Sequence, residues 1–353
     1  MARTLGAAAL ALSSAAAAPF ALNFAPAPAA NGFNNASLRS WGGGVIAAGG
    51  AFHLFASAFV GGCGLSSWGA NSVAIHAVGP TPTGPFAFVE RALPFYHHNV
   101  APIMAPDGTL LIFAIGMFPD PVPATCRPGA PNVVSGHGFE TVEAWSAPGV
   151  AGPWSPVAGA APNGRNLFNG TNPAPAFDPS GNGTLYVMSH DAHGFTVSAA
   201  ASWRGPYSAP RAVFPSTFPS SGFAGEDPFL WWNPNINNAE GGVGAWSALF
   251  HAYNSSDTKH QFAVGGYAQS AGRDVFGAWT VQDPAASPAY TTVFETFVKG
   301  DAGPTETTTF SRRERPKLLF DARGAPSVLY NGVCPEPPGN GACFTIAAPL
   351  KQA

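Results

Sequence analysis

The chain has 353 residues, enough for one large domain or two ordinary ones. Its net charge is −3 and only 10% of its residues are charged, so it lacks the basic field that nucleic acid or an anionic membrane requires. The 42 glycines and 36 prolines disfavour helices, and a hydrophobic content of 46% excludes a disordered chain.

The first element in chain order is an apolar N-terminal segment. Arg3 provides a positive charge, and an Ala-rich run from Leu5 to Ala18 ends in small residues directly before Pro19. The run is short for a membrane span. We predict a signal peptide over residues 1–18, a single domain over residues 19–353 and a secreted protein, with a buried helix or a membrane anchor as the alternatives.

The four cysteines agree with an oxidising destination. Cys334 and Cys343 flank a turn-rich segment that a disulfide would close, which leaves Cys63 and Cys126 as the second pair; other connectivities remain open. Four Asn-X-Ser/Thr triplets are glycosylation acceptors if the host glycosylates, at Asn35, Asn169, Asn182 and Asn254.

A repeat occupies the rest of the chain. Each of its five units has an opening turn motif, an apolar strand, a Gly turn and a second apolar strand. The opening motifs are Ser40-Trp-Gly-Gly-Gly-Val-Ile, His97-His-Asn-Val-Ala-Pro-Ile, Gly170-Thr-Asn-Pro-Ala-Pro-Ala-Phe, Gly225-Glu-Asp-Pro-Phe-Leu-Trp and Arg313-Glu-Arg-Pro-Lys-Leu-Leu.

These units, with no convincing amphipathic helix between them, predict an all-β fold, a five-bladed β-propeller. A β-sandwich is the alternative, but a sandwich needs no repeated opening motif. The fifth unit lacks a final strand after Cys343-Phe-Thr-Ile-Ala. We expect the segment from Ala21 to Phe33 to pair there and close the ring.

In a propeller the first residues of the innermost strands line a funnel at one end of the axis. The repeat places a polar set there, made of Trp41, His98, Asn99, Thr171, Asn172, Glu226, Asp227, Glu314 and Arg315. Two carboxylates on neighbouring units suit glycoside hydrolysis, which needs a proton donor and a base or nucleophile.

At these motifs the chain resembles the five-bladed propeller glycosidases of glycoside hydrolase family 43, the arabinanase and β-xylosidase type. Glu226-Asp-Pro-Phe-Leu is similar to the family's fourth-blade Glu-Gly-Pro element, which holds the general acid, so the resemblance gives Glu226 that role. Asn172-Pro-Ala-Pro-Ala-Phe is similar to the third-blade element, which in the family holds an Asp that tunes the acid.

Two departures leave the base open. Asn172 stands where the family has its third-blade Asp, and Trp41-Gly-Gly-Gly has no carboxylate where the family has its base. We expect Glu314 or Asp227 to replace the base, with the arginines on either side of Glu314 keeping it ionised. The alternative is that Glu314 and these arginines form a structural ion pair.

The remaining candidates are substrate contacts. Amides both donate and accept hydrogen bonds, and indole rings stack on sugars. We therefore expect Trp41, His98, Asn99, Asn172, Asp191 and Arg315 to contact substrate, with packing as the alternative for the aromatic rings. Asp191 ends a Ser-His-Asp segment without a Gly-x-Ser-x-Gly elbow, so a serine hydrolase is not expected.

The sequence predicts no cofactor and has no metal-binding motif, although some relatives hold an ion on the axis, so a structural calcium ion with unassigned ligands stays open. We predict a monomeric glycoside hydrolase with a carbohydrate substrate and no nucleic-acid or membrane partner. A non-catalytic, lectin-like propeller is the alternative, and a secreted protein-interaction scaffold is a third possibility.

Overall fold

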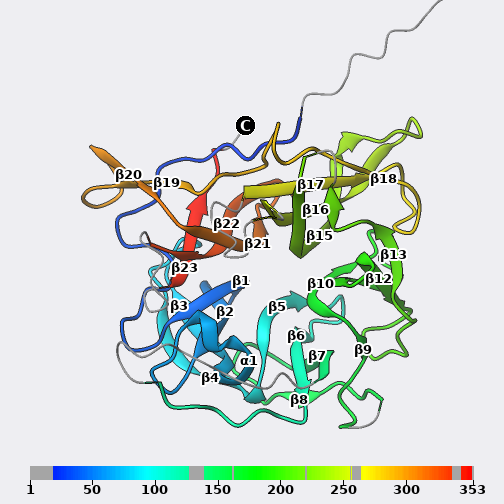
Figure 1. Cartoon of the computed structure of the whole chain (residues 1–353), viewed down its shortest axis with the longest axis horizontal. Helices are drawn as coiled ribbons and strands as arrows, with labels where there is room; N and C mark the ends of the chain where they lie inside the picture. Colours follow the sequence, from blue (N-terminus) through cyan, green and yellow to red (C-terminus); the bar gives the residue numbers. More distant parts are fainter. Residues whose placement is uncertain are drawn as a thin grey trace, which may run out of the picture.

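The computed structural model describes residues 19–126, 139–160, 163–218, 221–254, 256, 264–335 and 343–351. The predicted signal peptide lies outside these residues. In the described part, helix is limited to η1 (Leu65–Ser67) and α1 (Trp68–Asn71). Figure 1 shows antiparallel sheets arranged around a central axis, which confirms the predicted five-bladed β-propeller.

The first three blades follow one another along the chain, each with its first strand nearest the axis (Figure 1). Blade one contains β1 (Ser40–Ala48), β2 (Ala51–Phe59), β3 (Ser72–Gly79) and β4 (Ala87–Tyr96). Blade two contains β5 (His98–Met104), β6 (Leu110–Phe118), β7 (Phe139–Ala147), β8 (Ser155–Pro156) and β9 (Phe168–Asn169). Blade three contains β10 (Thr171–Phe177), β11 (Leu185–Asp191), β12 (Gly194–Ala200) and β13 (Arg211–Phe214).

Blade four has the longest strands, and blade five is completed by the N-terminal segment. Blade four contains β14 (Thr217–Phe218), β15 (Phe223–Asn237), β16 (Val243–Asn254), β17 (Val264–Ser270) and β18 (Trp279–Val281). A separate hairpin of β19 (Val293–Phe297) and β20 (Thr305–Thr309) precedes blade five, which contains β21 (Arg312–Phe320), β22 (Pro326–Cys334) and β23 (Phe344–Pro349).

The N-terminal segment pairs with the outer edge of blade five, as predicted. Phe24 bridges Leu350 and Phe33 bridges Thr345, both antiparallel. Phe33 is buried in a core shared by blades one and five. The chain therefore closes the ring by joining its beginning to its last strand.

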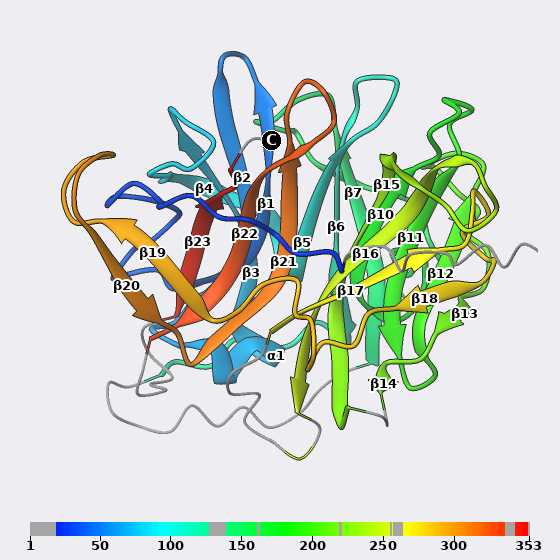
Figure 2. The same cartoon turned by 90° about the horizontal axis from the view of Figure 1, so that it is seen from above.

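Both predicted disulfides are present, Cys63–Cys126 and Cys334–Cys343. The first joins the connection between β2 and β3 to the segment that follows β6. Figure 2 shows α1, which lies in that β2–β3 connection, at one face of the propeller and the turn of the β1–β2 hairpin at the opposite face. The disulfide thus secures the face where β1, β5, β10, β15 and β21 begin.

One irregularity repeats in all five innermost strands and positions the site. Each strand has a register shift near its start, where one extra residue bulges from the ladder. The bulged residues all have a left-handed backbone; they are Gly42 (φ 64°), Asn99 (φ 51°), Asn172 (φ 57°), Asp227 (φ 56°) and Arg315 (φ 55°). A positive φ is costly for side chains other than Gly, and recurring instances mark functional or tightly constrained sites.

Candidate functional site

The bulged residues of four blades meet in a buried polar cluster, here called the axial cluster, which consists of Asn99, Asn172, Asp227 and Arg315. The Asn99 amide donates to Asn172 Oδ1 at 2.9 Å and to Asp227 Oδ1 at 3.1 Å. Arg315 Nη1 lies 2.9 Å from Asp227 Oδ1 and 3.3 Å from Asn172 Oδ1. The cluster thus links blades two, three, four and five through their side chains.

The fifth blade-opening position, Gly42, makes room for this arrangement. A Cβ at Gly42 would lie 2.9 Å from Arg315 Cβ and 3.2 Å from Arg315 Cδ. The first blade therefore has no side chain here because the Arg315 stem occupies the space. Any side chain at position 42 would therefore meet the Arg315 stem.

The axial cluster does not fit a structural metal ion. Two of its acceptor oxygens, Asp227 Oδ1 and Asn172 Oδ1, contact the Arg315 guanidinium and also accept from the Asn99 amide, and Asp227 Oδ2 lies 2.8 Å from His251 Nδ1. A guanidinium is a permanent cation, so the chain itself supplies the positive charge that an ion would bring.

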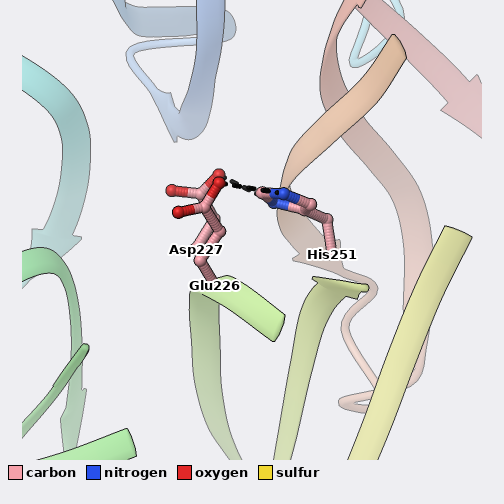
Figure 3. A group of neighbouring side chains, drawn as sticks. All are labelled: Glu226, Asp227 and His251. Carbon is pink, nitrogen blue, oxygen red and sulfur yellow. Dashed lines mark ion pairs between the residues drawn. The ribbon is translucent and has the colours of Figure 1, made fainter. Parts of the chain in front are cut away.

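Beside the axial cluster, His251 lies against two carboxylates, which Figure 3 shows together on one side of its ring. Its Nε2 is 3.1 Å from Glu226 Oε1, and its Nδ1 is 2.8 Å from Asp227 Oδ2. The register of blade four creates this contact, because Glu226 on β15 is directly opposite His251 on β16. We call Glu226, Asp227 and His251 the His251 triad.

The electrostatics of the His251 triad favour a charged imidazole. Burial alone would lower the pKa of His251, but the carboxylates of Glu314, Asp227 and Glu226 raise it to about 10. The side chain of His251 is fully buried, whereas that of Glu226 is 25% exposed. At neutral pH the triad therefore presents an accessible carboxylate backed by a buried cation.

The three residues of the triad also have one potential ligand atom each within 4.8 Å of the others, a spacing that a metal ion could bridge. Both ring nitrogens of His251 face carboxylate oxygens at ion-pair distances, however, and a protonated imidazole has no free lone pair. A metal ion would therefore first have to displace a proton from His251.

Glu314 is brought near this triad, but its surroundings differ from those predicted for it. Burial raises the pKa of the Glu314 carboxyl, and the carboxylates of Glu226 and Asp227 raise it further, against the opposing effect of His251 and Arg312. The flanking arginines do not surround it. Arg313 donates to the backbone carbonyls of Thr291 and Val293, and Arg315 pairs with Asp227.

The physical reason is the geometry of β21. Neighbouring side chains in a strand point to opposite faces, and the bulge redirects Arg315 to the axis. Arg312, two residues before Glu314, is the arginine that approaches it, with Nη1 at 3.7 Å from Oε1. Proximity in sequence therefore misidentified which cation faces this carboxyl group.

The other residues that we predicted to contact substrate occupy different surroundings. Asn99, Asn172 and Arg315 belong to the axial cluster, where their polar groups bond to one another. His98 is buried, with Nδ1 2.7 Å from Ser72 Oγ and its ring stacked on Trp68, and burial lowers its pKa well below the usual range.

Trp41 and Asp191 lie outside both clusters. The indole of Trp41 is 1% exposed and packs with Phe59, Cys63, Cys334 and Cys343, so it is part of the core in this structure. The Asp191 carboxylate accepts the backbone N–H of His193 at 2.7 Å in the β11–β12 hairpin. Substrate contact by either residue stays a prediction.

Sequence reasoning missed His251. The residue lies in the second strand of the fourth repeat, in Ala248-Leu-Phe-His-Ala, and its neighbours there are apolar. The available signal was the strand register: a β15–β16 pairing with the observed bulge places it opposite Glu226.

Among the helices that the structure describes, none is long and apolar enough to cross a membrane.

No protein-family model matches the chain, and no curated protein matches it in sequence. Solved structures do. An endo-arabinase from Bacteroides thetaiotaomicron is 12% identical with a TM-score of 0.53, covering 92% of this chain and 98% of that one. A thermostable family-43 glycoside hydrolase is 12% identical with a TM-score of 0.56, covering 93% of both chains.

A family 117 glycoside hydrolase from the marine bacterium Zobellia galactanivorans is also similar, with 11% identity, a TM-score of 0.54 and coverage of 93% of this chain and 90% of that one. At such identities the likeness shows the fold alone. The chain therefore shares the fold of these glycoside hydrolases, with little sequence similarity to them.

Proposed function

We propose that the protein is a secreted, monomeric glycoside hydrolase that cleaves glycosidic bonds in poly- or oligosaccharides at the funnel of the propeller. The observation that carries this proposal is the position of Glu226, a partly exposed carboxylate at the start of β15, with the buried carboxyl of Glu314 and the cation of His251 beside it. The shared fold of the glycoside hydrolases supports it. Two disulfides agree with secretion.

Hydrolysis of a glycoside needs two carboxyl groups in different protonation states. Glu226 and Glu314 open neighbouring blades and have unlike surroundings. Glu226 contacts His251, whereas burial raises the pKa of Glu314. Asp227 is less suited to react because Arg315, Asn99 and His251 occupy its oxygens. We assign Glu226 and Glu314 as the reacting pair and Asp227 as the residue that anchors them.

To test this, the purified wild-type chain, Glu226→Gln and Glu314→Gln are compared for their hydrolysis of a panel of aryl glycosides and polysaccharides. Each substitution should reduce kcat/KM by at least about 100-fold, the contribution of one acid–base group. Glu306→Gln on the exposed strand β20 is the matched control and should retain full activity. Retained activity in both site variants would overturn the assignment.

A lectin-like function is the second candidate, and two observations favour it. Blade one has Gly42 at the bulge, and blade three has Asn172, so neither supplies the carboxylate that family-43 enzymes have there. Absence of hydrolysis together with retention of the wild-type chain on a glycan array would select this function.

A further inference from the structure

We propose that His251 is a positioning residue that holds Glu226 in its ionised form, so that Glu226 acts as the base of the reaction and the buried Glu314 as the proton donor. The inference rests on the proposed hydrolase function. It reverses the role that the family resemblance gives Glu226. It follows from the carboxylates of Glu226 and Asp227, which contact the two ring nitrogens of His251.

His251 is held in a fixed position by its neighbours. Asp227 Oδ2 lies 2.8 Å from Nδ1, and Asp227 is itself held by Arg315 at 2.9 Å and by the Asn99 amide at 3.1 Å. The ring of Tyr253 packs against the imidazole at a centroid distance of 5.5 Å. A buried ring with these partners has little freedom to turn away from Glu226.

The groups that raise the pKa of His251 are Glu226 and Asp227 from β15 and, in its ionised form only, Glu314 from β21, all of them carboxyl groups. Arg315 and Arg312 each lie against one of those carboxyls, Asp227 and Glu314 respectively. The imidazole therefore has a carboxyl oxygen within 3.1 Å of each ring nitrogen, and a positive charge on it stabilises the anion of Glu226.

The surroundings of the two carboxyl groups differ. An acid at neutral pH must keep its proton until the leaving oxygen needs it, which suits a carboxyl in a low-dielectric site. Glu314 has such a site, with its side chain 5% exposed, whereas Glu226 is 25% exposed and beside the cation. The surroundings of the two carboxyl groups therefore favour Glu314 as the acid and Glu226 as the base, whereas the family resemblance gives the acid role to Glu226.

In the proposed hydrolysis, Glu226 takes a proton from a water molecule whose oxygen bonds to the anomeric carbon. The bond from that carbon to the glycosidic oxygen breaks, and its electron pair stays on the leaving oxygen, which takes the proton of Glu314. Solvent then removes the proton from Glu226 and returns one to Glu314, which restores the starting state.

The pH dependence of kcat/KM tests His251 directly. Its acid limb reports the ionisation of the base in the free enzyme. Glu226 loses its neighbouring cation in His251→Gln but keeps an amide donor, so the acid limb should move to higher pH by about one unit or more. A purely structural role would lower kcat/KM at every pH and leave the limb in place, which would overturn the proposal.

Chemical rescue tests the role of Glu226 without touching His251. In Glu226→Ala, added azide or formate should restore hydrolysis of an aryl glycoside with a good leaving group, because a small anion replaces a missing base. In Glu314→Ala the same activated substrate should be cleaved well without any anion, since a good leaving group needs no acid. The opposite pattern would return the acid role to Glu226.

Failure of the hydrolase proposal is distinguishable from failure of this one. The charge of His251 can be followed by ¹⁵N NMR of its ring in the wild-type chain and in Glu226→Gln, whether or not any substrate is cleaved. A ring that stays protonated from pH 6 to 8 supports the cation even in an inactive chain. A neutral ring in that range overturns the inference even in an active one.

Discussion

The side chains of Arg315 and Asp227 form an ion pair on the propeller axis, with Nη1 2.9 Å from Oδ1 and exposures of 12% and 1%. Both residues have the left-handed backbone of the bulge that opens every blade. Because Asp227 also contacts His251, this pair links the axial cluster to the His251 triad. The structural centre of the propeller and its candidate reactive site are therefore one connected network.

Replacing Arg315 should destabilise the fold. Arg315→Met leaves the buried carboxylate of Asp227 without its axial cation, and removing one partner of a buried pair costs about 3 kcal/mol or more. Arg315→Lys keeps the charge and should lose less. Urea denaturation measures both. We also expect EDTA to leave the wild-type midpoint unchanged, since the axis has its own cation; a lower midpoint in EDTA would refute this.

Gly42 should be more sensitive to substitution than a glycine with the same backbone elsewhere. Gly42 and Gly49 have φ values of 64° and 58°, but a Cβ at Gly42 meets Arg315 at 2.9 Å, whereas nothing lies within 4 Å at Gly49. Gly49→Ala should cost about 1 kcal/mol from backbone strain. Gly42→Ala should cost about 1–3 kcal/mol more from overpacking. Equal losses would show that Arg315 does not require the space.

Removing the N-terminal closure should open the ring. A chain that begins at Asn34 lacks the hydrogen bonds from Ala25 N to Pro349 O and from Phe33 N to Thr345 O, and it loses the buried ring of Phe33. We expect a loss of at least about 3 kcal/mol, the cost of removing one buried aromatic ring. The exposed edge of β23 should also promote aggregation. A chain that begins at Pro19 is the control, and its melting temperature should equal that of the full chain.

The stabilising effect of His251 should depend on pH. The pKa of His251 rises from 6.5 to about 10 on folding, so its charge stabilises the fold fully below pH 6.5, and this stabilisation is lost as the pH rises through 10. The gap in unfolding free energy between wild type and His251→Gln should therefore shrink from pH 6.5 to pH 10. His190→Gln, at the same register position in blade three, is the control. A gap that is constant with pH would contradict the charged state.

Much of the fold followed from the repeat. The opening motifs at Trp41, His98, Thr171, Glu226 and Glu314 all begin innermost strands, and both disulfides and the pairing of Phe33 match their predictions. These features depend on local turn chemistry and on the need of every strand edge for a partner. Glycines between apolar strands indicate such turns without knowledge of the three-dimensional neighbours.

The site was predictable only in part. The sequence indicated Glu226, Asp227 and Glu314 as a polar set, and the structure brings them together. It did not indicate His251 as their common neighbour. Nor did it indicate that Arg315 faces Asp227 and that Arg313 faces the backbone carbonyls of Thr291 and Val293. One extra residue in a strand changes which face each later side chain occupies, so charge pairing could not be inferred from adjacency.

The class of fold, the number of blades and the end of the axis where polar groups gather can be inferred from the amino-acid sequence alone. They depend on short-range patterns of glycine, proline and apolar residues. The charge partners of the carboxyl groups and their burial depend on the tertiary structure. Those depend on distances of about 3 Å and on burial among segments far apart in the chain, such as Arg315 with Asn172 and His251 with Glu314.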